Sequence, residues 1–153
     1  MKVLLKGVAS GNTLISEAAH FAIQGILHHV ASHRLLMRIM AEISHKNRNV
    51  RAKIAQYVGV AVQVFPEQIV LSLEKEIANF FKAGVSDAHK ATRANAREAF
   101  YHWNAKHPEV AKALMETLDS STIKAMQSEI PARPYCSNLL SVKTPRSQSP
   151  FMK

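Results

Sequence analysis

Residues 86–100 read SDAHKATRANAREAF, and their spacing predicts a helix with two different sides. Lys90, Arg93 and Arg97 lie three and four residues apart, so on a helix they gather along one side. The other side is apolar, and continued into the following turn it consists of Thr92, Ala96, Ala99, Phe100 and Trp103. We expect this side to face a core, while the basic side either grips an acidic partner or is only a solvated surface.

The same pattern occurs earlier in the chain. Residues 49–60, NVRAKIAQYVGV, align with residues 91–103, ATRANAREAFYHW, so that Arg51 matches Arg93. In the same alignment Ile54 matches Ala96 and Val58 matches Phe100. A period of about 40 residues with two helices per unit is typical of an α-solenoid of the HEAT or armadillo type. We therefore predict stacked helix pairs whose internal loops, SGNTL, SHKNRN and SDAHKA, emerge along one edge.

Helical periodicity elsewhere predicts an all-α fold of about seven helices. The expected helices are 13–30, one that begins after Ser32, one between the SHKNRN loop and the FPE break at 65–67, 67–83, one from Ser86 or Asp87 to about 107, 108–118 and 120–129. Asn12 is a candidate cap for the first of them, and Gly84 is placed to end the helix 67–83.

The chain of 153 residues is long enough for one domain with a hydrophobic core. We assign residues 1–130 to a HEAT-like domain. Residues 131–153 are rich in Pro, Ser and basic residues and lack periodicity, so we expect a disordered tail.

The residues favour a binding module over an enzyme. No pairing of a nucleophile with a base is visible, and we expect no cofactor. His29 and His33 have a spacing that can bind a metal, but a break at Ala31-Ser32 separates them and no carboxylate is close, so we expect no metal site. Every apolar stretch is interrupted by polar residues, which argues against a membrane span. The single cysteine, Cys136, fits a reducing, cytosolic or nuclear setting.

The net charge of +9 attracts polyanions, and the candidates are nucleic acid, an acidic membrane surface and a protein with an acidic face. Cations in the predicted loops, such as Lys46, Arg48 and Lys90, could contact phosphates. No exposed aromatic residues interleave with them, and no nucleic-acid motif is visible, so the sequence disfavours nucleic acid.

Residues 2–129 resemble the TOG domains of the CLASP family of microtubule-associated proteins, most clearly over residues 82–126. In that family the last complete repeat combines an Asp-containing loop, an Ala-Arg pair, an aromatic-rich helix, a His-Phe-Pro-like break and a closing Leu-(Asp/Glu)-(Ser/Pro)-Ser turn. The matching positions are Val85, Asp87, Arg93, Ala96-Arg97, Phe100-Tyr101, His107-Pro108 and Leu118-Asp119-Ser120-Ser121. The sequence departs mildly from the family pattern at Ala83-Gly84, where the family has Lys-Gly, and at Glu98, where the family has Lys.

The resemblance implies a partial paddle of HEAT repeats that binds αβ-tubulin through the loops within each repeat. Carried over by position, the tubulin-binding residues would be Asn12, Thr13, Lys46, Arg48, Asn49, His89, Lys90 and Arg93. The match covers the C-terminal half of such a domain, so the aromatic contact of its first repeat is absent. We therefore expect a non-catalytic half-domain, either a fragment or one that works with another chain, that contributes to microtubule stabilisation at cytoplasmic microtubules and the spindle.

Two roles remain open for the arginines. Asp87 precedes Arg93 by six residues, in the position where HEAT repeats commonly place an internal ion pair. Arg93, and by the same reasoning Arg51, either hold their loops or meet a partner. His89 and Lys90 at the loop tip are the better candidates for contact.

The end of the predicted domain offers a second motif. Ser128, Glu129, Ile130 and Pro131 fit the Ser-x-Ile-Pro pattern by which many microtubule plus-end proteins bind end-binding proteins. The alternative interpretation is a plain helix end, since Glu129 suits an acidic groove poorly.

The alternative function is a generic HEAT-repeat interaction scaffold or a basic nucleic-acid-binding solenoid. Aligned loops on a flat paddle would favour tubulin, whereas a groove lined by the second helices would favour a peptide or an acidic polymer.

Overall fold

The computed structural model describes residues 1–128, and in this range it consists of α-helices and one short 3-10 helix. The helices are α1 (Lys2–Val8), α2 (Thr13–His29), α3 (His33–Met40), α4 (Arg48–Val64), α5 (Glu67–Leu71), α6 (Glu74–Val85), α7 (Lys90–Lys106), α8 (Pro108–Met115) and α9 (Ser120–Ser128), with η1 (Ala41–Ser44) after α3. The predicted all-α solenoid is confirmed for these residues.

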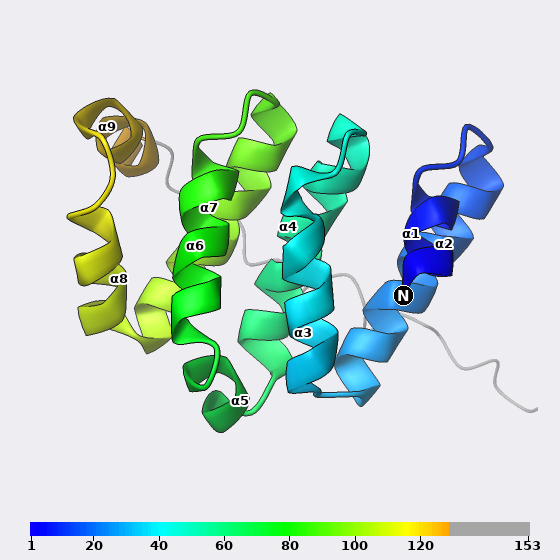
Figure 1. The fold of residues 1–153 in the computed structure, drawn as a ribbon, viewed down its shortest axis with the longest axis horizontal. Helices are drawn as coiled ribbons and strands as arrows, with labels where there is room; N and C mark the ends of the chain where they lie inside the picture. Colours follow the sequence, from blue (N-terminus) through cyan, green and yellow to red (C-terminus); the bar gives the residue numbers. More distant parts are fainter. Residues whose placement is uncertain (129–153) are drawn as a thin grey trace, which may run out of the picture.

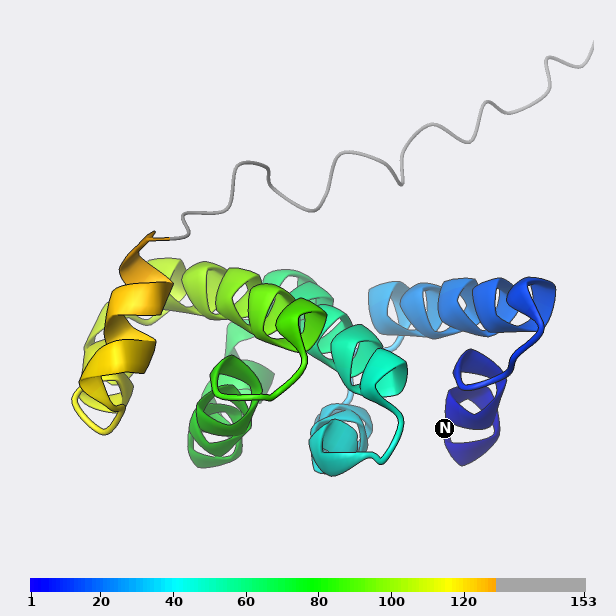
Figure 2. The same ribbon diagram turned by 90° about the horizontal axis from the view of Figure 1, so that it is seen from above.

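The helices are arranged as four pairs, α1 with α2, α3 with α4, α6 with α7, and α8 with α9 (Figure 1). In the first three pairs the first helices form one layer and the second helices form another, whereas α9 runs across the two layers (Figure 2). The loop inside each pair lies at the upper edge of Figure 1, and the connections between pairs, including α5, lie at the lower edge. The three predicted loops therefore share one edge, and the loop before α9 joins them.

Several local predictions differ from the structure. Residues 2–8 add a helix that the sequence pattern did not reveal, and the predicted helix 67–83 is divided into α5 and α6. The division follows from Leu73, which leaves helical geometry (φ −115°, ψ 20°) and is buried with 1% of its surface exposed. The number of α-helices in residues 1–128 is therefore nine and not about seven.

Helix α4 packs against α7 in the closest association between pairs. A Cβ placed on Gly59 would lie 3.1 Å from Ala99 Cβ, so the two helices approach closely at their centres. Near one end the Asn95 side chain donates to the Ala52 carbonyl at 2.8 Å. Near the other, Lys106 Nζ donates to the carbonyls of Val62 and Gln63 at 2.8 and 2.9 Å. The pairs aligned in the sequence, Ile54 with Ala96 and Val58 with Phe100, are all buried, which confirms the predicted inner faces.

The sequence predicted that Gly84 ends its helix, and this prediction is wrong. Gly84 lies inside α6, which continues to Val85, and a Cβ at this position would lie 2.8 Å from Ala96 Cβ of α7. Gly7 and Ala19 make the same contact between α1 and α2. Glycine is therefore required here by the spacing of the two helices in a pair.

Replacement of Gly84 by Ala should lower the free energy of unfolding by about 1–3 kcal/mol, because overpacking outweighs the gain in helix propensity. Gly25→Ala is the matched control, since no atom lies within 4 Å of its Cβ position, and we expect it to stabilise by about 0.5–1 kcal/mol. The double variant Gly84→Ala with Ala96→Gly should recover part of the loss. Urea denaturation measures all three, and a stabilised Gly84→Ala would contradict the packing argument.

His20 joins the first helix pair to the second. Its Nδ1 lies 2.9 Å from the Tyr57 hydroxyl and its Nε2 lies 3.4 Å from Lys53 Nζ, both on α4. A lysine ammonium can only donate, so Nε2 accepts and the ring proton resides on Nδ1, which donates to Tyr57. Burial, with a smaller contribution from the charge of Lys53, lowers the pKa of His20 from 6.5 to about 4. The junction therefore requires a neutral imidazole.

The stability of the chain should fall as pH decreases from about 6.5 to about 4. In that window the unfolded chain protonates His20 while the folded chain resists protonation, so protons favour unfolding. Burial lowers the pKa of the neighbouring Lys53, and the charge of Glu17 offsets only part of this decrease. His20→Gln, which retains a donor for Tyr57, should flatten this part of the stability profile measured by denaturation at each pH. An unchanged profile would mean that another group causes the pH dependence.

Candidate functional site

In two loops of the common edge, an asparagine side chain caps the helix that follows. Asn12 Oδ1 accepts hydrogen bonds from the backbone N–H groups of Leu14 and Ile15, and caps α2 as predicted. Asn47 Oδ1 accepts from Asn49 N–H at 2.9 Å and caps α4. Ser86 and Asp87 are not the cap of α7, because the helix begins at Lys90 with His89 in the cap position. These bonds satisfy helix N–H groups that have no partner within the helix.

Arg51 connects two neighbouring loops. Its Nε and Nη2 donate to the two carboxylate oxygens of Asp87 at 2.7 and 3.1 Å, and its Nη1 donates to the His45 carbonyl at 2.9 Å. Burial would raise the pKa of Asp87, but the hydrogen bonds from Arg51 and from His89 N–H outweigh it and hold the pKa below its usual value. The side chains of Arg51 and Asp87 are 18% and 11% exposed, so the pair is largely shielded from water.

Arg93 occupies the equivalent position in the next pair but binds backbone. Its Nη1 donates to the carbonyls of Asp87 and Ala88 at 2.8 and 2.9 Å. The predicted ion pair between Asp87 and Arg93 is therefore wrong, because the carboxylate of Asp87 is bound by Arg51 of the preceding helix pair. Both arginines hold loops, which is one of the two roles that the sequence left open for them. In the first pair Ser16 stands at this position, and its hydroxyl donates to the Val8 carbonyl.

The remaining candidate residues differ in how much they face solvent. Lys46, Arg48, Asn49 and Lys90 are exposed on the two middle loops, and Asn12 and Thr13 are exposed on the first. His89 is half-buried, and its Nδ1 lies 3.2 Å from the Thr92 hydroxyl, which is fully buried. The edge therefore brings together Lys46, Arg48 and Lys90 as exposed cations, while Arg93 and His89 are engaged within their loop.

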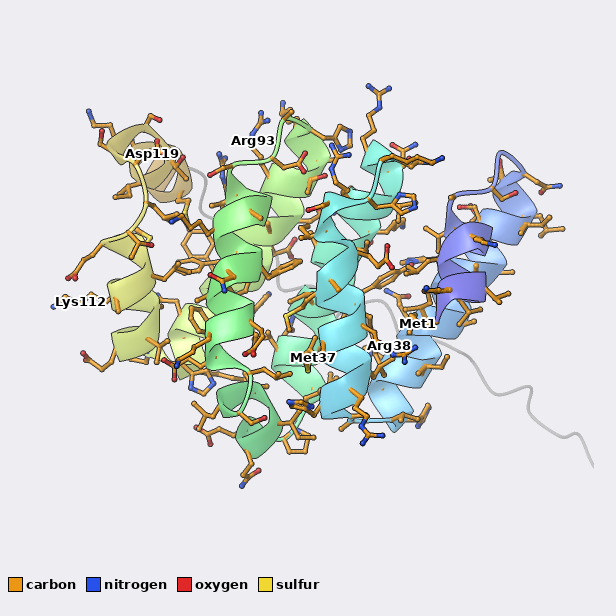
Figure 3. The ribbon with its side chains drawn as sticks, in the orientation of Figure 1. Met1, Met37, Arg38, Arg93, Lys112 and Asp119 are labelled. Carbon is orange, nitrogen blue, oxygen red and sulfur yellow. The ribbon has the colours of Figure 1, made fainter. Side chains whose placement is uncertain are left out.

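A fourth loop, the one before α9, belongs to the same edge, although the sequence pattern did not predict it there. Arg93 and Asp119 both lie along this edge in Figure 3, whereas Lys112 projects from α8 away from it. Hydrogen bonds from the side chains of Ser121 and Thr122 and from Thr122 N–H hold the pKa of Asp119 well below its ordinary value. This loop thus carries a negative charge at neutral pH, and the Leu-Asp-Ser-Ser turn was the signal that could have revealed it.

The sequence also raised the questions of a metal site, a membrane span and an end-binding motif, none of which involves the loop edge. Within residues 1–128 no group of three His, Cys, Asp or Glu side chains is placed to hold a metal ion. His29 ends α2 and His33 begins α3. In the part of the chain that the structure describes, no helix has the length and apolar character needed to cross a bilayer. Of the proposed end-binding motif, Ser128 is the last residue of α9, while Glu129, Ile130 and Pro131, like the predicted tail 131–153, lie outside the described residues.

Comparison with known protein families gives one match that covers most of the chain. The model of the family described as CLASP N terminal matches residues 1–127. The chain belongs to this CLASP family. The match includes all four helix pairs almost to the end of α9.

Individual CLASP relatives are distant in sequence. The chain is 24% identical to the protein CLASP-2 of Caenorhabditis briggsae over 126 residues, which are 82% of this chain and 15% of that protein. It is 23% identical to CLASP-3 of Caenorhabditis elegans over 120 residues, 78% of this chain and 12% of that protein. It is 25% identical to CLIP-associating protein 1-A of Xenopus laevis over 133 residues, which are 85% of this chain and 9% of that protein. The chain thus corresponds to less than a sixth of the length of each of these CLASP proteins.

Arg51→Ala should lower the free energy of unfolding by about 2–3 kcal/mol, because it leaves the shielded carboxylate of Asp87 without its main partner. It should also speed hydrogen exchange at His89 N–H, which donates to Asp87 at 2.7 Å. Arg48→Ala is the control, since Arg48 is an exposed arginine three residues earlier on the same helix. If both variants were equally stable in urea, the contact between Arg51 and Asp87 would have no structural role.

Proposed function

We propose that the chain is a non-catalytic tubulin-binding module of the TOG type, and that it contributes to microtubule stabilisation and dynamics. Membership of the CLASP family supports a CLASP-type role. The observation that supports tubulin binding is that the loop cations fall into two groups. Arg51 and Arg93 fix the loops through hydrogen bonds. Lys46, Arg48 and Lys90 are exposed on these loops. Cations held at fixed positions along one edge complement an extended acidic protein surface.

The small size of the hollow between the second helices α4 and α7 favours the loop edge as the binding surface. Between α4 and α7 the hollow lined by Gln56, Asn95 and His102 has a volume of about 10 Å³. This is room for about one water molecule and not for a peptide. A ligand groove lined by the second helices, the arrangement that would favour a peptide scaffold or an acidic polymer, is therefore not offered at this junction.

The same proposal covers domain organisation and location. We propose that residues 1–130 act as the tubulin-binding unit, that the basic residues 131–153 form a tail, and that the protein works in the cytoplasm on the microtubules of the cytoskeleton and the spindle. Residues 128–131 are proposed as a contact for end-binding proteins.

Simultaneous change of Lys46, Arg48 and Lys90 to Ala should weaken binding to microtubules by about 10- to 100-fold, since each exposed charge contributes modestly. Co-sedimentation across a salt series measures this, and wild-type binding should weaken as ionic strength rises. The matched control changes Lys75, Lys82 and Lys112, three exposed lysines outside the loops, to Ala, with the same loss of net charge.

Folding is checked by urea denaturation, in which the loop variant should match the wild type because none of its three side chains is buried. Undiminished binding by the loop variant, or an equal loss in the control, would show that the loop edge is the wrong surface. A folded wild-type chain that does not bind even at low ionic strength would refute the proposed function itself.

A further inference from the structure

A hollow lies in the first-helix layer, between α3 with η1 on one side and α6 on the other. Its volume is about 310 Å³, which is in the range of pockets that bind ligands. The residues that line it include Met37, Met40, Ile43, Glu76, Asn79 and Phe80. Figure 3 shows Met37 on the side of α3 that faces α6, whereas Arg38 lies on the side that faces α2. This hollow is referred to below as the α3–α6 groove.

The α3–α6 groove lies in the middle of the row of helix pairs. Its walls belong to the second and third pairs, which have the first pair on one side and the fourth on the other (Figure 1). A further helix pair stacked at either end of the row would therefore leave the groove open. A segment that fills the groove has to lie across the face of the first-helix layer.

The lining combines an apolar floor with an acidic side chain. Met40 and Phe80 are buried, with 5% and 3% of their surfaces exposed, and Met37 beside them is 40% exposed. Methionine side chains adapt to the shape of an apolar ligand. Glu76 is exposed, and within residues 1–128 its carboxylate forms neither a hydrogen bond nor an ion pair. The groove therefore fits a short segment that carries apolar side chains next to a cation.

The chain itself contains a segment of this composition. Residues 139–143 read LLSVK, so three apolar side chains, those of Leu139, Leu140 and Val142, precede Lys143. Residues 131–153 contain no aspartate or glutamate, so no carboxylate side chain in this stretch competes with Glu76 for Lys143.

Residues 139–143 can reach the groove from the end of α9. Tyr101 donates a hydrogen bond to the Met126 carbonyl, which holds the last turn of α9 against α7. Residues 129–138 separate Ser128 from Leu139, and ten residues span up to about 33–36 Å. In the first-helix layer α6 lies between the fourth pair and the groove, and packed helices are about 8–10 Å apart. The length of the connection is therefore sufficient.

We propose that residues 139–143 dock in the α3–α6 groove of their own chain, with the three apolar side chains against the lining and Lys143 beside Glu76. The connection gives the segment an effective concentration on the order of millimolar, so it outcompetes a separate ligand of equal affinity at micromolar concentration. The same reasoning favours residues 139–143 over Phe151 and Met152, because effective concentration falls as the connection lengthens.

Methyl NMR of the methionines tests the docking in the full chain of 153 residues. A nitroxide spin label is attached to Thr144→Cys in a Cys136→Ser background, which leaves Lys143 in place. The signals of Met37 and Met40 should lose most of their intensity. Met115 is the internal control, because it lies at the end of α8 and outside the lining. Unchanged signals of Met37 and Met40, or an equal loss at Met115, would overturn the proposal.

A mixed sample distinguishes docking within the chain from docking between copies. It combines isotope-labelled chains that lack the spin label with unlabelled chains that carry it. The signals of Met37 and Met40 should keep their intensity in this mixture. A loss of intensity would assign the groove to a second copy and overturn docking within the chain.

Substitutions on both sides of the contact test its chemistry. Leu139→Ser combined with Leu140→Ser should restore the signals of Met37 and Met40, whereas Phe151→Ser, the control in the same stretch, should not. Glu76→Lys should restore part of the intensity, and Glu74→Lys is its control, since Glu74 is exposed on the same helix outside the lining.

Urea denaturation checks that each variant is folded. Signals that stay broadened in the double leucine variant would overturn docking by residues 139–143. Equal recovery with Phe151→Ser would do the same for the choice of segment, and equal recovery with Glu74→Lys would remove Glu76 from the contact.

Discussion

The contact between α4 and α7 sets the spacing of the two middle loops of the edge. Gly59 and Ala99 let the two helices approach closely, and hydrogen bonds from Asn95 and Lys106 to α4 carbonyls prevent them from sliding. The carbonyls that Lys106 binds lie at the C-terminal end of α4, where no partner exists within the helix and a positive charge is favourable. At the loop end, Arg51 joins Asp87 across the same junction. The two middle loops are thus held by backbone and side-chain contacts that the exposed lysines do not share.

This arrangement separates two uses of positive charge that look alike in the sequence. Arg51 and Arg93 each donate to backbone carbonyls of the loop that precedes their own helix. A guanidinium suits this task because its several N–H groups point in fixed directions, which a lysine ammonium does not offer. The exposed Lys46 and Lys90, by contrast, extend from these fixed loops into solvent. Net charge therefore overstates the number of cations that a partner can meet.

The sequence predicted most of the fold because hydrophobic spacing and repetition are local signals. The second helices of the pairs, their buried faces and the alignment of three loops all followed from residues such as Val58 and Phe100. The division at Leu73 and the continuation of α6 through Gly84 did not follow, since both depend on what a neighbouring helix places against them. The partner of Asp87 was missed for the same reason. Arg93 is close in sequence, but Arg51, from the preceding pair, is close in space.

The four loops also differ in sign along the row. The first loop carries neutral residues, the two middle loops expose Lys46, Arg48 and Lys90, and the last carries Asp119, whose charge is held by Ser121 and Thr122. An edge that ends in a carboxylate on one side only is electrically asymmetric. A partner that presents acidic groups in a repeating line meets attraction over the centre and repulsion at a single end. On the proposed function, this charge asymmetry would make the two directions of a polar filament inequivalent to the loop edge before any specific contact is made.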